Sequence, residues 1–109
     1  MSTAGFDVLG IGNAIVDILA HTDDRFLVRE GLEKGAMALV DAKRAGELYK
    51  KIGPAVECSG GSAANTIAGL VSLGARGAFI GKVCDDQLGR VFRHDIRALG
   101  VSFETPAAA

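Results

Sequence analysis

The segment Cys58-Ser-Gly-Gly-Ser-Ala-Ala-Asn-Thr66 decides how the chain is interpreted, because it has the pattern of a strand end, a two-glycine turn and a helix start. Apolar residues at helical spacing follow it as far as Gly74, which ends the pattern. Gly60 and Gly61, here called the glycine turn, allow a sharp bend and the close approach of another molecule. The unpaired amides of the first helical turn would face that molecule, and Asn65 could project toward it.

Two interpretations of the glycine turn are open at this point. In the first, the turn and the helix start form a binding surface for hydroxyl or phosphate oxygens. In the second, they form a tight strand-to-helix connection in which Ser59 or Ser62 is the N-cap of the helix. An isolated Gly-Gly pair does not decide between the two, so the rest of the chain has to.

The composition is that of an ordinary globular domain. The chain has 109 residues, 49% of them hydrophobic and 23% charged, which suits one domain with a modest core and excludes a disordered chain. A net charge of −1 without any basic run argues against binding to nucleic acid. Neither a signal peptide nor a membrane-spanning stretch is evident. Cys58 and Cys84 suit neither a disulfide framework nor a zinc site, so we expect free thiols and a cytoplasmic location.

Polar residues interrupt the apolar N-terminal segment. If residues 14–20 are extended, alternate side chains share a face. One face would then carry Asn13, Ile15 and Asp17, and the other Ala14, Val16 and Ile18. Polar groups in an apolar strand are costly unless they have partners. Either Asn13 and Asp17 bind a polyol with Ile15 between them, or both bond local backbone at a kink in the strand.

The remaining patterns alternate between strand and helix. Helices are expected at 23–31, 42–52, 63–73 and 88–99, and strands at 6–11, 14–20, 36–40, 78–83 and 101–103, with a further strand ending at the glycine turn. Such alternation predicts an α/β layered fold on a largely parallel sheet with helices on both faces. Ligands of these sheets bind at the carboxyl ends of the strands, where Asn13, Gly60 and Gly61 could meet.

Three motifs resemble those of the ribokinase-like, PfkB-type carbohydrate and nucleoside kinases: Gly10-Ile-Gly-Asn-Ala-Ile-Val-Asp17, Gly60-Gly-Ser-Ala-Ala-Asn65 and Gly81-Lys-Val-Cys-Asp-Asp-Gln-Leu-Gly89. Each motif alone is weak, but their joint order and spacing from about Phe6 onward are specific. The first motif and the run to Met37–Leu39 look most like the adenosine-kinase subgroup, although many bacterial sugar kinases share this look. Cys84 and Ile67 depart from the common family pattern and leave the choice between sugar and nucleoside open.

This resemblance implies a ribokinase-like fold of three α/β/α layers with a largely parallel sheet and a small β lid. Residues 1–109 would be the N-terminal portion of a single kinase domain, with lid strands around 14–22 and 36–40. The catalytic aspartate and the sites for ATP and Mg²⁺ would lie in a C-terminal portion outside this chain. We therefore nominate no catalytic, cofactor-binding or metal-binding residue.

The resemblance also implies how a sugar ring would be held. Asp17 would accept hydrogen bonds from two sugar hydroxyls. The backbone of Gly60 and Gly61 and the amide of Asn65 would bind the same ring. Asn13 would hold the ring from the strand side.

Ile15, Met37 and Leu39 would form the lid and the pocket wall against a base or the apolar face of a sugar. For Met37 and Leu39 a place in the core is the other possibility. The implied reaction is transfer of the γ-phosphoryl group of ATP to a primary hydroxyl of a sugar or nucleoside, with Mg²⁺. The expected partner is that small molecule, not a nucleic acid or a membrane. The protein would be a monomer or a homodimer formed through the lid.

Two other classes of protein, a dinucleotide-binding domain and a non-catalytic binding module, are alternatives to the kinase. A dinucleotide-binding domain needs a third glycine where this chain has Ile15, and a helix directly afterwards, so the match fails. A non-catalytic module that binds a sugar or nucleoside could use the same surface without phosphoryl transfer. A Gly-x-Gly-Asp segment downstream would favour the kinase.

Overall fold

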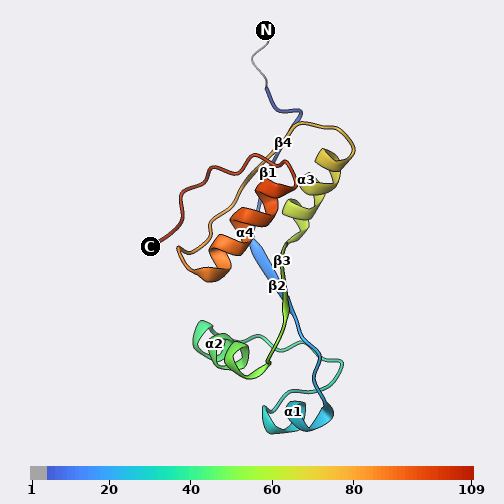
Figure 1. Ribbon diagram of the computed structural model, residues 1–109, viewed down its shortest axis with the longest axis vertical. Helices are drawn as coiled ribbons and strands as arrows, with labels where there is room; N and C mark the ends of the chain where they lie inside the picture. The colour runs from blue at the N-terminus through green and yellow to red at the C-terminus, as the bar shows by residue number, and fades with distance from the viewer. Residues whose placement is uncertain (1–4) are drawn as a thin grey trace. The chain divides into compact units, whose positions relative to one another are not determined.

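The computed structural model describes residues 5–109, which form two compact units. One unit runs as far as Asp17 and resumes over Glu57–Ala109, and the other comprises Ile18–Val56. Figure 1 labels the elements, which confirm the α/β class. In chain order they are β1 (Val8–Ile11), β2 (Ile15–Leu19), α1 (Asp24–Arg29), α2 (Ala42–Lys51), β3 (Val56–Gly60), α3 (Ser62–Ser72), β4 (Gly77–Ile80) and α4 (Gln87–Ala98).

The first unit is built on a parallel pair of strands, as the alternating pattern predicts. In the pairing of β1 with β4, Val8 lies opposite Gly77 and Ile11 lies opposite Ile80. Ser102 extends the sheet by a single parallel bridge to β4, where the amide of Phe79 donates to its carbonyl oxygen at 2.9 Å. The expected strand at 101–103 is therefore reduced to one bridge. β2 pairs with β3 in a second two-stranded sheet.

Three phenylalanines form the centre of the first unit's core. The rings of Phe79, Phe92 and Phe103 are fully buried, with centroids 5.3–6.1 Å apart. Ile67 of α3 and Ile96 of α4 belong to the same cluster. Burial of each such side chain stabilises the fold by about 1.5–3 kcal/mol, so this cluster fixes both helices on the β1–β4 sheet.

Aspartates begin three of the helices. Asp23, Asp41 and Asp86 each accept a hydrogen bond from the backbone amide three residues later, at 2.8–2.9 Å, at the starts of α1, α2 and α4. Each bond pairs one of the amides that a helix leaves unsatisfied at its first turn. The helix starts that the sequence predicts, at residues 23, 42 and 88, lie within one residue of those observed.

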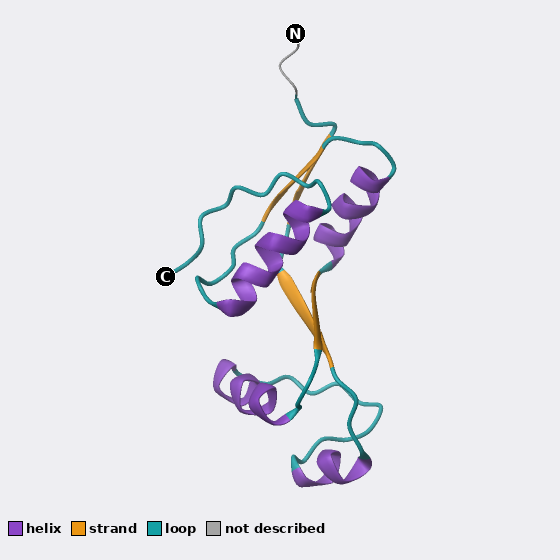
Figure 2. Cartoon of the chain, viewed as in Figure 1, coloured by secondary structure: helices purple, strands orange, loops and turns teal. Residues whose placement is uncertain are grey.

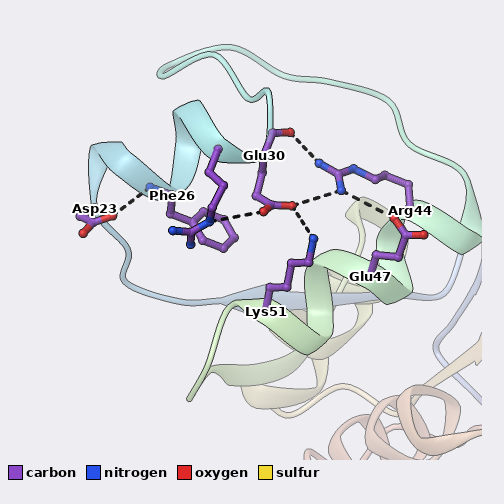
Figure 3. A network of polar contacts seen from close by, with 7 residues as sticks. Asp23, Phe26, Glu30, Arg44, Glu47 and Lys51 are labelled. Carbon is purple, nitrogen blue, oxygen red and sulfur yellow. Dashed lines mark hydrogen bonds and ion pairs between the residues drawn. The ribbon is translucent and has the colours of Figure 1, made fainter.

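A network of charged side chains joins α1 to α2 in the second unit (Figure 3). The Glu30 carboxylate accepts hydrogen bonds from Lys51 at 3.0 Å and from Arg44 at 3.2 Å, and its Oε2 lies 3.7 Å from Arg29. Arg44 also donates to the backbone carbonyl of Glu30 at 2.6 Å. These cationic groups cover the carboxylate, so only 5% of the Glu30 side chain is exposed.

We expect the second unit to loosen in acid through Glu30. The hydrogen bond from Lys51, together with the charges of Lys51 and Arg44, holds the pKa of Glu30 below its ordinary value of 4.5, although desolvation opposes the shift. Because the folded-state pKa is lowered, the network stabilises the unit above pH 4.5, and this stabilisation is lost as the pH falls through the lower pKa. Hydrogen exchange of the α1 and α2 amides between pH 7 and pH 3 measures the effect.

Glu30→Gln is the matched variant, because it keeps the shape of the side chain and removes its charge. Its α1 and α2 amides should exchange faster than those of the wild type at pH 7, and the difference should vanish in acid. Equal exchange of the two proteins at pH 7 would contradict a stabilising role for the network.

The expected strand at 36–40 is wrong. Figure 2 draws the whole connection between α1 and α2 as loop, and Met37 and Leu39 are 87% and 91% exposed. An extended segment forms a strand only when a neighbour pairs its backbone, and residues 36–40 have no such neighbour in the described part of the chain. The expected strand at 78–83 also ends early, at Ile80.

Candidate functional site

The segment 13–17 presents a polar face at the surface of the first unit. Asn13, Ile15 and Asp17 are exposed, whereas Ala14 and Val16 are half-buried against the hydrophobic core. This is the alternation that the sequence predicts for an extended segment. The apolar face holds the segment in place, and the polar face is left open to a ligand.

The glycine turn lies directly against this polar face. A Cβ atom on Gly60 would overlap the Asp17 carboxylate, whose Cγ is only 3.0 Å from the position that such an atom would take. A Cβ atom on Gly61 would lie 2.8 Å from the backbone oxygen of Asn13 and 3.6 Å from the Cβ of Ile15. Gly61 also has a φ of 97°, which disfavours any other residue. The two glycines therefore make the close approach of Asn13, Ile15 and Asp17 possible.

The helix α3 starts immediately after the turn, and no side chain caps it. Its N-cap is Gly61 and makes no side-chain hydrogen bond, so the interpretation with Ser59 or Ser62 as the N-cap is wrong. The amide of Asn65 donates to the carbonyl of Gly61 at 2.9 Å and closes the first turn, and Asn65 itself is exposed. The first amides of α3 therefore have no side-chain cap within residues 5–109, at the positive end of the helix dipole.

The chemistry of these groups complements a neutral polyol. Within residues 5–109, the side chains of Asn13, Asp17 and Asn65 form no hydrogen bond or ion pair with other residues. A carboxylate accepts hydrogen bonds, backbone amides donate them, and a side-chain amide does both. A sugar hydroxyl also does both, so the arrangement can hold several hydroxyls of one ring.

Met37 and Leu39 lie in the second unit. Met37 lines a cavity of about 510 Å³ there together with Leu27, Val40 and Leu48. Their role as the lid of the substrate site stays a prediction.

Several residues that shape the first unit's site are not among those that the sequence predicts for it. The backbone amide of Ser59, directly before the glycine turn, donates to Oδ2 of Asp95 at 2.9 Å. A Cβ atom on Gly12 would lie 2.8 Å from the Cβ of Ala63, and one on Gly81 would lie 2.8 Å from the carbonyl oxygen of Gly12. The glycines could be found by their places in the motifs, whereas nothing in the sequence distinguishes Asp95 from other polar residues of its helix.

Two kinds of feature are absent from residues 5–109. No three His, Cys, Asp or Glu side chains gather there in a way that could hold a metal ion. None of the helices described has the length and apolar character that crossing a membrane requires.

Solved structures of kinases resemble this chain closely in fold. The adenosine kinase of Sinorhizobium meliloti is 62% identical, with a TM-score of 0.76, over 96% of this chain and 32% of that protein. A probable sugar kinase of Rhizobium etli CFN 42 is 53% identical, with a TM-score of 0.77, over 95% of this chain and 32% of that protein. A fructokinase of Klebsiella pneumoniae is 41% identical over 59 residues, which are 54% of this chain and 18% of that protein.

This chain therefore spans about a third of the length of these solved relatives. The fold that they share with it is the ribokinase-like arrangement that the motifs imply. The family model of the pfkB family carbohydrate kinases matches residues 36–105, which is more than half of the chain. The chain belongs to the pfkB family of carbohydrate kinases.

Proposed function

We propose that this chain supplies the acceptor-binding part of an ATP-dependent kinase that phosphorylates a primary hydroxyl of a sugar or nucleoside. The observation that carries the proposal is the close approach of Asp17 to the glycine turn, directly before the uncapped start of α3. The pfkB family match and the kinases among the solved relatives support the same reaction class.

In this proposal the residues of the first unit bind and orient the acceptor. Asp17 accepts hydrogen bonds from two ring hydroxyls, while the first amides of α3 and the amide of Asn65 bind neighbouring oxygens. Asn13 and Ile15 limit the ring from the strand side. Holding the ring in a single orientation presents its primary hydroxyl to the phosphoryl donor, and such positioning is a large part of catalysis in phosphoryl transfer.

ATP, bound with Mg²⁺, would supply the phosphoryl group and neutralise charge during its transfer. We assign no residue of this chain to the binding of ATP or Mg²⁺. We place those sites, and the catalytic base, in the part of the complete protein that this chain does not include.

For the acceptor we propose a nucleoside such as adenosine, with a free sugar as the alternative. The adenosine kinase of S. meliloti is more similar to this chain than the fructokinase of K. pneumoniae. Ile15, which is 43% exposed beside Gly61, offers an apolar surface that suits a base.

The test is a phosphoryl-transfer screen of the complete protein with ATP and Mg²⁺. The acceptors are adenosine, other nucleosides, ribose, fructose and fructose phosphates. Turnover of nucleosides alone would support the whole proposal, and turnover of free sugars alone would overturn its nucleoside part. Binding of an acceptor without any turnover would overturn the kinase assignment in favour of a non-catalytic binding module.

Met37→Ala should change the preference among acceptors more than it changes stability. The side chain is 87% exposed, so its truncation removes little packing, whereas a lid residue would contact the base or sugar. The ratio of kcat/KM values for two acceptors and the melting temperature measure the two effects. A large fall in melting temperature with unchanged selectivity would instead give Met37 a packing role and contradict its role in the lid. Val28→Ala is the control, because Val28 is similarly exposed in the same unit, at 81%.

A further inference from the structure

The end of β3 is attached to α4 by a contact that no motif indicates. Oδ2 of Asp95 accepts a hydrogen bond from the backbone amide of Ser59 at 2.9 Å, across a sequence separation of 36 residues. Ser59 as a whole residue is half-buried. A backbone amide in such a place needs a partner, and a carboxylate is a stronger acceptor than a neutral group.

Asp95 is held on a rigid part of the first unit. The next residue, Ile96, is 1% exposed, and Phe92 one turn earlier is fully buried in the aromatic cluster. The other oxygen of Asp95, Oδ1, lies 3.8 Å from Nδ1 of the exposed His94. Because the core fixes the helix, the carboxylate has a fixed position from which to hold the strand.

The held amide directly precedes the glycine turn. Gly60 and Gly61 have no side chains to restrain them, yet their positions set the distances to Asp17 and Asn13. Glycine backbones lose the most conformational freedom on ordering, so an outside restraint is needed to keep such a turn in one conformation.

We propose that Asp95 is a positioning residue for the acceptor site. Through the amide of Ser59 it fixes the glycine turn and the start of α3, and so sets the affinity for the acceptor without touching it. This inference rests on the proposed function for its kinetic consequence, whereas the restraint on Ser59 can be measured without any substrate.

The first measurement is hydrogen exchange at single amides in the complete protein, comparing wild type with Asp95→Ala and Asp95→Asn. In Asp95→Ala the amide of Ser59 should exchange roughly tenfold faster or more, because its acceptor is gone. Asp95→Asn keeps an oxygen acceptor and should stay near the wild type. The amide of Phe79, in the core sheet, should not change in either variant.

The second measurement is steady-state kinetics of the same proteins. Asp95→Ala should raise the KM for the acceptor roughly tenfold while the KM for ATP stays within about twofold, and Asp95→Asn should restore most of the loss. Asp85→Ala is the matched control, because Asp85 is an exposed carboxylate beside the start of α4 whose ion-pair partner is Arg90, at 3.8 Å. Its KM for the acceptor should equal that of the wild type.

The outcomes separate this inference from the proposed function. Unchanged exchange at Ser59 in Asp95→Ala overturns the positioning role, whatever the enzyme does. Faster exchange with an unchanged KM for the acceptor overturns the link to the site. If the wild type itself transfers no phosphoryl group, the proposed function fails, and acceptor binding measured by calorimetry then decides the positioning role. A Kd for adenosine or fructose that is equal in wild type and Asp95→Ala overturns the role. A higher Kd in Asp95→Ala supports it.

Discussion

Asp17→Ala in the complete protein should lower kcat/KM for the acceptor by a factor of roughly 30 to 1,000. This factor corresponds to a loss of about 2–4 kcal/mol of transition-state stabilisation. The carboxylate is exposed beside the glycine turn and has no partner within residues 5–109, so it is available to two hydroxyls of one ring. In the proposed function, removing it would delete two charge-assisted hydrogen bonds to the acceptor. Because the Asp17 side chain forms no hydrogen bond or ion pair within residues 5–109, the melting temperature should change little.

Asp17→Asn separates charge from shape in this prediction. The side-chain amide of Asp17→Asn keeps one accepting oxygen. The kcat/KM of this variant should therefore lie between the values of the wild type and of Asp17→Ala. Glu104→Ala is the control, because Glu104 is an exposed carboxylate of the same unit whose ion-pair partner is Arg97, at 3.2 Å. Near-normal turnover of Asp17→Ala would remove Asp17 from the acceptor site.

The local features of the fold could be predicted from the sequence because each has a local cause. Asp41 and Asp86 begin helices through bonds that span three residues, and the alternation around Ile15 follows from the geometry of an extended chain. The glycine turn is a strand-to-helix junction, as its sequence predicts. In each case the deciding residues lie within a few positions of one another.

The features that the sequence missed depend on distant partners. Residues 36–40 have strand character but no neighbouring strand in the described chain, so they remain a loop. Asp95 bonds an amide 36 positions earlier, and nothing in a helical pattern indicates which polar residue does so. Glu30 is similar, because Lys51, 21 positions away, donates to it. Long-range polar contacts of this kind leave no periodic signal in the sequence.

The choice of N-cap for α3 also needed three-dimensional information. Ser59 and Ser62 are both good N-cap residues by type, and the sequence alone could not exclude them. In the structure the backbone at Gly61 adopts a φ of 97°, and within residues 5–109 no side-chain hydrogen bond caps the helix. The uncapped helix start is thus a property of the turn as a whole.

Gly61→Ala tests that property, and we expect it to reduce both acceptor binding and stability. The added Cβ would lie 2.8 Å from the carbonyl oxygen of Asn13, a backbone atom that cannot turn away as a side chain could. A non-glycine residue at a φ of 97° adds strain of about 1–3 kcal/mol. To relieve the overlap with Asn13 and the backbone strain, the turn has to move away from the strand that carries Asp17.

Gly69→Ala is the matched control, because Gly69 lies inside α3, the helix that Gly61 precedes. A Cβ at Gly69 would meet nothing within 4 Å, and alanine in a helix interior is favoured over glycine by about 0.5–1 kcal/mol. Urea unfolding should therefore give a lower free energy of unfolding for Gly61→Ala and a higher one for Gly69→Ala. The KM for the acceptor should rise only in Gly61→Ala. If Gly61→Ala instead kept the wild-type KM and lost stability alone, the turn would be a structural connection and the acceptor would bind elsewhere.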